Sequence, residues 1–135
     1  MKLSAIKNAT RSIDEGVEKD CFIDGVKFRV RGKNNTAWNL KSQELNAKIS
    51  TEDRLSTERM LVREREIETE LLLHTVLLGW SGLTDDEGNE IPYSIEMART
   101  ILEDNDYRLL RSAIFDASLS VTSDAVSSLR ADIKN

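Results

Sequence analysis

Between residues 16 and 32, apolar residues alternate with basic ones after an Asp24-Gly25 pair. A period of two places the apolar side chains on one face of a strand and the basic side chains on the other. The Asp-Gly pair is typical of a type I′ turn, because both central positions of that turn need positive φ. The segment therefore predicts a β-hairpin that packs one face, Val26, Phe28 and Val30, against other elements, because an isolated hairpin is marginally stable.

The rest of the chain has mainly helical periodicity. We expect helices over about residues 36–49, 51–79, 95–104 and 106–118. Good N-cap residues precede them: Asn35 or Thr36, Ser50 or Thr51, Ser94, and the Asp-Asn-Asp run at 104–106. In the last predicted helix Leu110, Ala113, Ile114 and Ala117 share one face. The serine-rich tail, residues 119–135, is weakly patterned and leaves two interpretations open: a short helix from Asp124 or a mobile tail.

These elements predict one α+β domain over residues 1–135, mostly α, in which an N-terminal β-hairpin packs on a bundle of four to five helices. The long predicted helix 51–79 changes character along its length. Its first half is highly charged, whereas residues 71–78 are apolar nearly all round, so we expect one exposed and one buried end. The apolar residues of the charged half exceed what a narrow packing stripe needs, which marks a candidate partner-binding surface: Leu55, Met60, Leu61 and Val62.

Composition and charge narrow the class of protein. The single cysteine, Cys21, excludes an internal disulfide framework and favours a reducing compartment. We find no signal peptide or membrane-spanning stretch and expect a soluble, cytoplasmic protein. The net charge of −5 is uneven, since residues 1–33 hold eight basic and five acidic residues and the remainder eleven basic and nineteen acidic. A basic head on an acidic body predicts self-association or an acidic partner, with random unevenness as the alternative.

The acidic turn DDEGN (85–89) is the first candidate for chemistry. With Gly88 at the sixth position of an EF-hand loop, the first and twelfth positions are Leu83 and Ser94, which cannot supply the required ligands. The chain has one histidine, His74, in a leucine-rich segment, and one cysteine in a predicted strand. No phosphate-binding glycine loop or zinc spacing is present. We therefore expect no catalytic residue, cofactor or metal, and hence no enzyme.

The basic face of the hairpin, with Lys27, Arg29 and Arg31, continues to Lys33 and forms a row of the kind that contacts phosphates. The row lacks interleaved aromatic residues for base stacking, since Phe28 points to the opposite face. The chain as a whole is acidic. A small nucleic-acid-binding regulator that uses Lys27, Arg29 and Arg31 therefore stays as an alternative, and the same residues are candidates for contact with a protein partner.

The segment from Leu71 to Ala117 carries an ordered series of motifs: an apolar run ending in LLGWSGL, the acidic turn, an extended EIPYS, then SIEMARTIL and YRLLRSAIFDAS. This order resembles the tail assembly chaperones of long-tailed, siphovirus-type bacteriophages. The residues that match the recurring frame are Trp80, Gly82, Leu83, Gly88, Ser94, Glu96 and Ala98. We interpret Trp80, Gly82, Leu83, Gly88 and Ser94 as residues that mark the fold and not as contact residues.

The resemblance implies a protein that coats and solubilises the long helical tape measure protein and promotes polymerisation of the tail tube around it. It implies self-association, and a longer frameshifted form that recruits tail tube protein. It also implies a location in the host bacterial cytoplasm and absence from the mature virion. A minor structural subunit of the tail is the other alternative that we retain.

Overall fold

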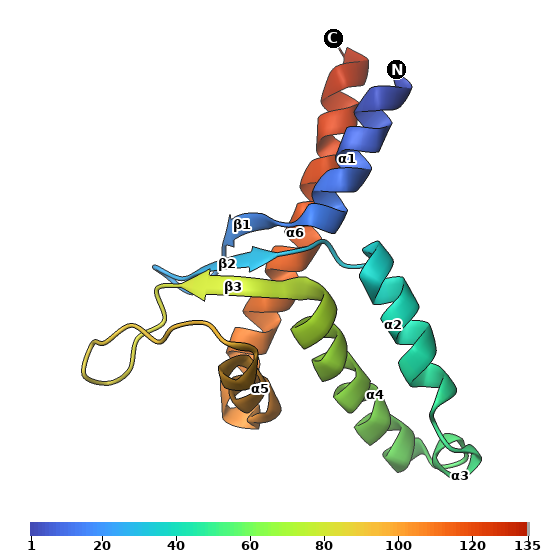
Figure 1. Cartoon of the computed structure of the whole chain (residues 1–135), viewed down its shortest axis with the longest axis vertical. Coiled ribbons are helices and arrows are strands. Elements are labelled where there is room, and N and C mark those ends of the chain that lie inside the picture. Colours follow the sequence, from blue (N-terminus) through green and yellow to red (C-terminus); the bar gives the residue numbers. More distant parts are fainter. Residues whose placement is uncertain (135) are drawn as a thin grey trace.

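The computed structural model describes the backbone of residues 1–134 and the side chains of residues 1–130. The described chain forms six α-helices and a small antiparallel sheet, which confirms the α+β, mostly α class (Figure 1). The helices exceed the expected four to five because an N-terminal helix forms and one predicted helix is divided. In chain order the elements are α1 (Leu3–Glu15), β1 (Val17–Asp20), β2 (Lys27–Val30), α2 (Thr36–Ala47), α3 (Thr51–Arg54), α4 (Thr57–Leu71), a π-helical turn (Leu72–Val76), β3 (Leu77–Ser81), α5 (Ile95–Glu103), a 3₁₀ turn (Asn105–Tyr107) and α6 (Arg108–Lys134).

The predicted hairpin forms as β1 and β2, but β2 is the central strand of a three-stranded sheet because β3 pairs with its other edge. The predicted type I′ turn is wrong. A longer connection spans residues 21–26, in which the Val26 amide donates to the Ile23 carbonyl at 3.2 Å. Only Gly25 of the two central residues has positive φ, at 78°, which is the pattern of a type II turn.

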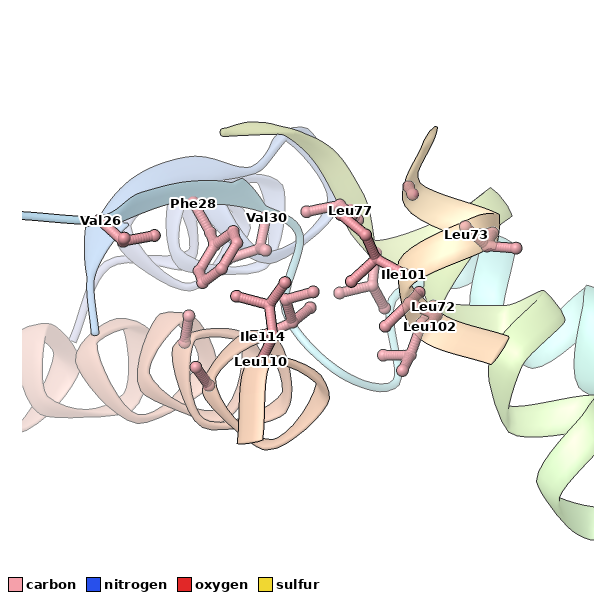
Figure 2. Close-up of a cluster of buried hydrophobic side chains, with 14 of the residues drawn as sticks. Val26, Phe28, Val30, Leu72, Leu73, Leu77, Ile101, Leu102, Leu110 and Ile114 are labelled. Atoms are coloured by element: carbon pink, nitrogen blue, oxygen red, sulfur yellow. The ribbon is translucent and has the colours of Figure 1, made fainter. Parts of the chain in front are cut away.

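The core lies between the inner face of the sheet and α6, and continues under α5 and the π-helical turn. Phe28 and Val30 are fully buried. Figure 2 shows both side chains directed at Ile114 and Leu110 of α6. The predicted apolar faces of the hairpin and of the helix that begins near residue 106 are therefore confirmed. The other core residues come mainly from the π-helical turn, the start of β3 and α5, among them Leu72, Leu73, Leu77, Ile101 and Leu102.

The serine-rich tail is neither mobile nor a separate short helix within the part of the chain that the structure describes. It continues α6, which runs the length of the molecule and packs against α1 (Figure 1). Val121 and Ala125 are buried, and Asp124 forms an ion pair with Lys19. No element was predicted for residues 3–15, where α1 forms and buries Ala9 against its partner helix.

The predicted helix 51–79 is wrong in two places. The chain leaves the helix at Leu55, and the Ser56 side chain accepts from the Arg59 amide at 3.3 Å, which starts a new helix. Beyond Leu71 the helix widens into a π-helical turn, and residues 77–81 form β3. The apolar run that suggested a buried helix is equally suited to a buried strand, and pairing with β2 decides the outcome.

Candidate partner-binding surface

Helices α2, α3 and α4 form a helical arm, residues 36–71, that projects from the body of the molecule (Figure 1). Three of the four apolar residues predicted to contact a partner are exposed on it: Leu55 at 84%, Leu61 at 61% and Val62 at 51%. Met60 is half-buried and is a weaker candidate. Leu40 on α2, at 66% exposure, was not predicted and adds to the surface.

The base of the arm is fixed by a buried arginine on α6. Arg111, which is 7% exposed, donates Nε to Glu68 Oε1 at 3.0 Å and Nη1 to Thr69 Oγ1 at 2.8 Å. The same guanidinium donates to two backbone carbonyls, at Arg65 in α4 and Leu102 at the end of α5, both at 3.2 Å. Because the planar fork presents five N–H donors, one side chain ties three helices together.

A second arginine joins the arm to α5. Arg99 donates both Nη groups to the Glu70 carboxylate, with an Nη2–Oε2 distance of 3.1 Å, and also pairs with Glu103. Hydrogen bonding by Arg99 holds the pKa of Glu70 below its ordinary value, although burial acts in the opposite direction. Glu70 in turn raises the pKa of Arg99. Both groups therefore stay charged at neutral pH.

Asn35 fixes the other end of the arm, where α2 begins. Its Oδ1 accepts from the Trp38 amide at 2.9 Å, which confirms the predicted cap. Its Nδ2 donates to the carbonyls of Gly32 and Thr75, at 2.9 and 2.8 Å. Thr75 lies in the π-helical turn, so a fully buried amide connects the two points where the arm leaves the body.

The predicted basic row is divided by the structure. Lys27 and Arg29 lie on the outer face of the sheet. On the neighbouring strand β1, Asp20 pairs with Lys27 and Glu18 pairs with Arg29. Lys27 Nζ lies 3.8 Å from Glu18 and 4.0 Å from Asp20, so the face has acids beside each base. Arg31 is half-buried beyond the end of β2, and it does not extend the row.

Lys33 leaves the row entirely. Its ammonium lies over two aromatic rings, 4.9 Å from the Phe115 centroid and 6.0 Å from that of Trp38. Four adjacent cations along one strand, as the sequence suggested, are therefore not present as one phosphate-binding surface.

The residues of the matched frame have structural contacts. Trp80 is half-buried, stacks edge-on against Tyr93 and donates Nε1 to the Ile91 carbonyl at 2.8 Å. Gly82 has φ of 87°, and a Cβ there would lie 1.9 Å from the Gly25 carbonyl oxygen. Leu83 packs against the core cluster.

The acidic turn is closed by hydrogen bonds between its own residues. The Asp85 carboxylate accepts from the amides of Glu87 and Asn89, at 3.0 and 2.9 Å, and Gly88 has φ of 85°. Ser94 then caps α5 by accepting from the Met97 amide at 3.1 Å. The turn and the cap that the sequence predicted are confirmed.

The structure keeps Cys21 and His74 apart. Cys21 lies at the end of the sheet where Lys27 pairs with Ser81, whereas His74 precedes the opposite end of β3. His74 Nε2 lies 3.0 Å from Glu70 Oε2. Within the described part of the chain, no three His, Cys, Asp or Glu side chains gather as a metal site would require. None of the described helices is both long and apolar enough for a transmembrane span.

Two anchoring residues, Arg111 and Asn35, were not recognised as such from the sequence, although Asn35 was predicted as a cap. For Arg111 a signal existed, because Arg111, Ile114 and Ser118 follow the i, i+3, i+7 spacing of one helix face. A charged residue on such a buried face needs partners, so it could have been identified as a polar anchor.

Comparison with models of protein families gave a match over most of the chain. A family model described as YdaY prophage protein matches residues 33–135, which are 103 of the 135 residues. The chain belongs to the YdaY prophage protein family. It is therefore a phage-related protein. The matched region includes the whole helical arm, β3, α5 and α6, and it begins just after β2. Comparison with curated proteins and with solved structures gave no match.

Proposed function

We propose that this YdaY-family protein is a tail assembly chaperone that binds and solubilises the tape measure protein and promotes tail tube polymerisation around it. It acts by binding and not by catalysis. The observation that carries the proposal is the helical arm, which holds large apolar side chains in water on a scaffold anchored at its base.

An exposed apolar surface with charges of both signs suits a helical partner. Leu55, Leu61 and Val62 lie among the charged residues of α3 and α4, which include arginines and glutamates. An amphipathic helix binds such a surface through apolar anchors at helical spacing, flanked by polar contacts. Family membership supports a role in phage biology, and the resemblance of residues 71–117 to tail assembly chaperones supports the tail in particular.

The proposal includes the wider cycle that the resemblance implies. The protein works in the host bacterial cytoplasm and leaves before the virion is complete. A longer frameshifted form recruits tail tube protein. A minor structural tail subunit is the competing proposal, and finding the protein in purified virions would favour it.

Nucleic-acid binding through the hairpin is less well supported. Glu18 and Asp20 lie beside Lys27 and Arg29, so the outer face of the sheet presents a mixed potential to a phosphate backbone. Salt-dependent binding of the protein to a generic DNA duplex would favour this alternative over the chaperone.

Co-expression with the tape measure protein tests the proposal. The wild-type protein is expected to raise the soluble fraction of the tape measure protein. Leu55→Asp with Leu61→Asp should remove most of that gain and leave the fold intact, because both side chains are exposed. Equal tape measure solubility with and without the protein would show that the proposal is wrong.

A matched control separates the arm from general surface effects. Leu119→Asp with Val126→Asp places two acids at exposed apolar positions of α6, at 47% and 44% exposure. This variant should retain the wild-type effect. If both double variants lose the effect equally while remaining folded, the client does not bind at the arm.

A further inference from the structure

A groove of about 600 Å³ lies between the acidic turn, α5 and the start of α6, at the end of the molecule away from α1. Its lining includes the apolar side chains of Ile23, Leu83, Met97, Tyr107 and Leu109. Three of these are exposed large apolar residues: Met97 at 39%, Tyr107 at 51% and Leu109 at 68%.

The same groove carries exposed carboxylates. Asp85, Asp86 and Asp106 belong to its lining, and no ion pair among the described side chains neutralises any of them. Residues 84–107 hold eight acidic residues and one basic residue. We call this feature the acid-rimmed groove. Its surface would best accommodate an element that is both apolar and basic.

Helix α1 has that chemistry. Leu3 and Ile6 are exposed at 84% and 43%, and Lys2, Lys7 and Arg11 are exposed as well. The first acidic residue of the chain is Asp14. The helix has no side-chain cap and no acid in its first turn, so the positive end of its dipole is not compensated there. An acidic surface against this helix would stabilise it.

We propose that α1 of one copy docks in the acid-rimmed groove of a second copy. Leu3 and Ile6 enter the apolar lining while Lys7 and Arg11 meet Asp86 and Asp106. The inference concerns self-association of this chain alone and does not require the chaperone function proposed above.

Helix α1 cannot reach the acid-rimmed groove of its own chain. α1 packs against the part of α6 near Asp124 and Ala125, whereas the groove lies at its first residues. The intervening helix, about 17 residues at 1.5 Å per residue, separates them by roughly 25 Å. Two different surfaces therefore meet between copies. Reciprocal docking of two copies closes a two-fold dimer, and head-to-tail docking generates rings or open spirals.

The expected contact is weak and sensitive to salt. One helix of 13 residues buries less surface than a stable protein interface requires, so assembly should depend on protein concentration. Because the pairing of charges is exposed, salt should screen it. Sedimentation velocity of the full-length protein at ~50 mM NaCl should show species larger than the monomer, and at ~500 mM the apparent association constant should fall at least about ten-fold.

A charge exchange between copies tests the pairing directly. Lys7→Glu with Arg11→Glu changes the helix, and Asp86→Lys with Asp106→Lys changes the groove. Each variant alone should lose at least about ten-fold in association. An equal mixture should recover association, because the acidic helix fits the basic groove and the native helix fits the native groove.

Controls decide whether the effect is local. Lys48→Glu with Arg59→Glu makes the same change in net charge at exposed positions of the arm and should leave association unchanged. In a Cys21→Ala background, Leu3→Cys mixed with Leu109→Cys should give an oxidised cross-linked dimer, whereas Leu3→Cys mixed with Val126→Cys should not.

Four results would overturn the proposal. They are wild-type association by the Lys7→Glu, Arg11→Glu variant, no recovery in the mixture, equal loss of association in the arm control, and no cross-linking between Leu3→Cys and Leu109→Cys. A protein that is monomeric at high concentration and low salt would overturn it as well.

Discussion

Arg111→Met is expected to lower the free energy of unfolding by about 3 kcal/mol. Methionine keeps most of the apolar stem but removes four hydrogen bonds, to Glu68, Thr69, Arg65 and Leu102. A hydrogen bond to a charged group contributes about 1.5–3 kcal/mol, and loss of one partner from a buried ion pair costs about 3–5 kcal/mol. The Glu68 side chain is 43% exposed and can be solvated by water, which places the estimate at the lower end of that range.

The corresponding change in melting temperature follows from chain length. An unfolding entropy of about 2.1 cal/mol/K per residue gives about 280 cal/mol/K for this chain, so 3 kcal/mol lowers the melting temperature by about 10 °C. Urea unfolding followed by circular dichroism measures the free energy, and calorimetry measures the temperature. Amide exchange in α4 should accelerate as well, because the anchor holds that helix to the body.

Arg108→Met is the matched control, since Arg108 is exposed on the same helix and makes one surface hydrogen bond, to the Asn105 carbonyl. We expect it to change stability by less than about 0.5 kcal/mol. If Arg111→Met is as mild as this control, the guanidinium does not anchor the arm.

Three further changes test the segment between β3 and α5 and the contact of Arg99 with Glu70. Gly82→Ala should destabilise the protein much more than Gly88→Ala, because both glycines have positive φ but only the first lacks space for a Cβ; equal urea midpoints would refute this. Trp80→Ala should cost about 3–5 kcal/mol in urea unfolding, and Trp80→Phe, which loses the indole donor but keeps a ring, should cost less. Glu70→Gln should reduce stability above pH 4.5, the ordinary glutamate pKa, because Arg99 lowers the pKa of Glu70 in the folded state. The difference from wild type should shrink as pH falls through that lowered value, and a difference that instead grows on acidification would contradict the assignment.

Local signals in the sequence were sufficient for the hairpin and for most helix starts. The alternation around Phe28 identified the buried face of β2, and it did so because a strand has only two faces. Asn35, Ser50 and Ser94 each accept from a backbone amide three residues later, as an N-cap does. These features depend on residues within a few positions of each other, so the sequence contains the information.

The segment from Leu72 to Ser81 could not be assigned in the same way. A continuous run of apolar residues has no hydrophobic period. It is therefore compatible with a buried helix and with a buried strand. The choice is made by β2, whose free edge is some 50 residues away in sequence. Tertiary pairing thus overrides a locally reasonable helix.

The contact between α1 and α6 was missed for a different reason. Each helix presents small residues to the other, such as Ala9 and Ala125. Small side chains give a weak periodic signal, and the pairing becomes favourable only when both helices are present. The arm surface was easier to predict because an exposed Leu61 in a charged helix departs from the usual pattern on its own.

The extent of the family match bears on how the protein works. Residues 33–135 include the arm and all of the acid-rimmed groove except Ile23, but β2 lies outside the matched region and supplies fully buried Phe28 and Val30 to the core. Without β2 the edge of β3 and the facing side of α6 would be exposed to water, so the matched region does not bury its own core. The N-terminal segment, residues 1–32, therefore has a structural role in completing the sheet. In the proposed assembly it also supplies α1, and the same segment that completes one copy joins it to the next.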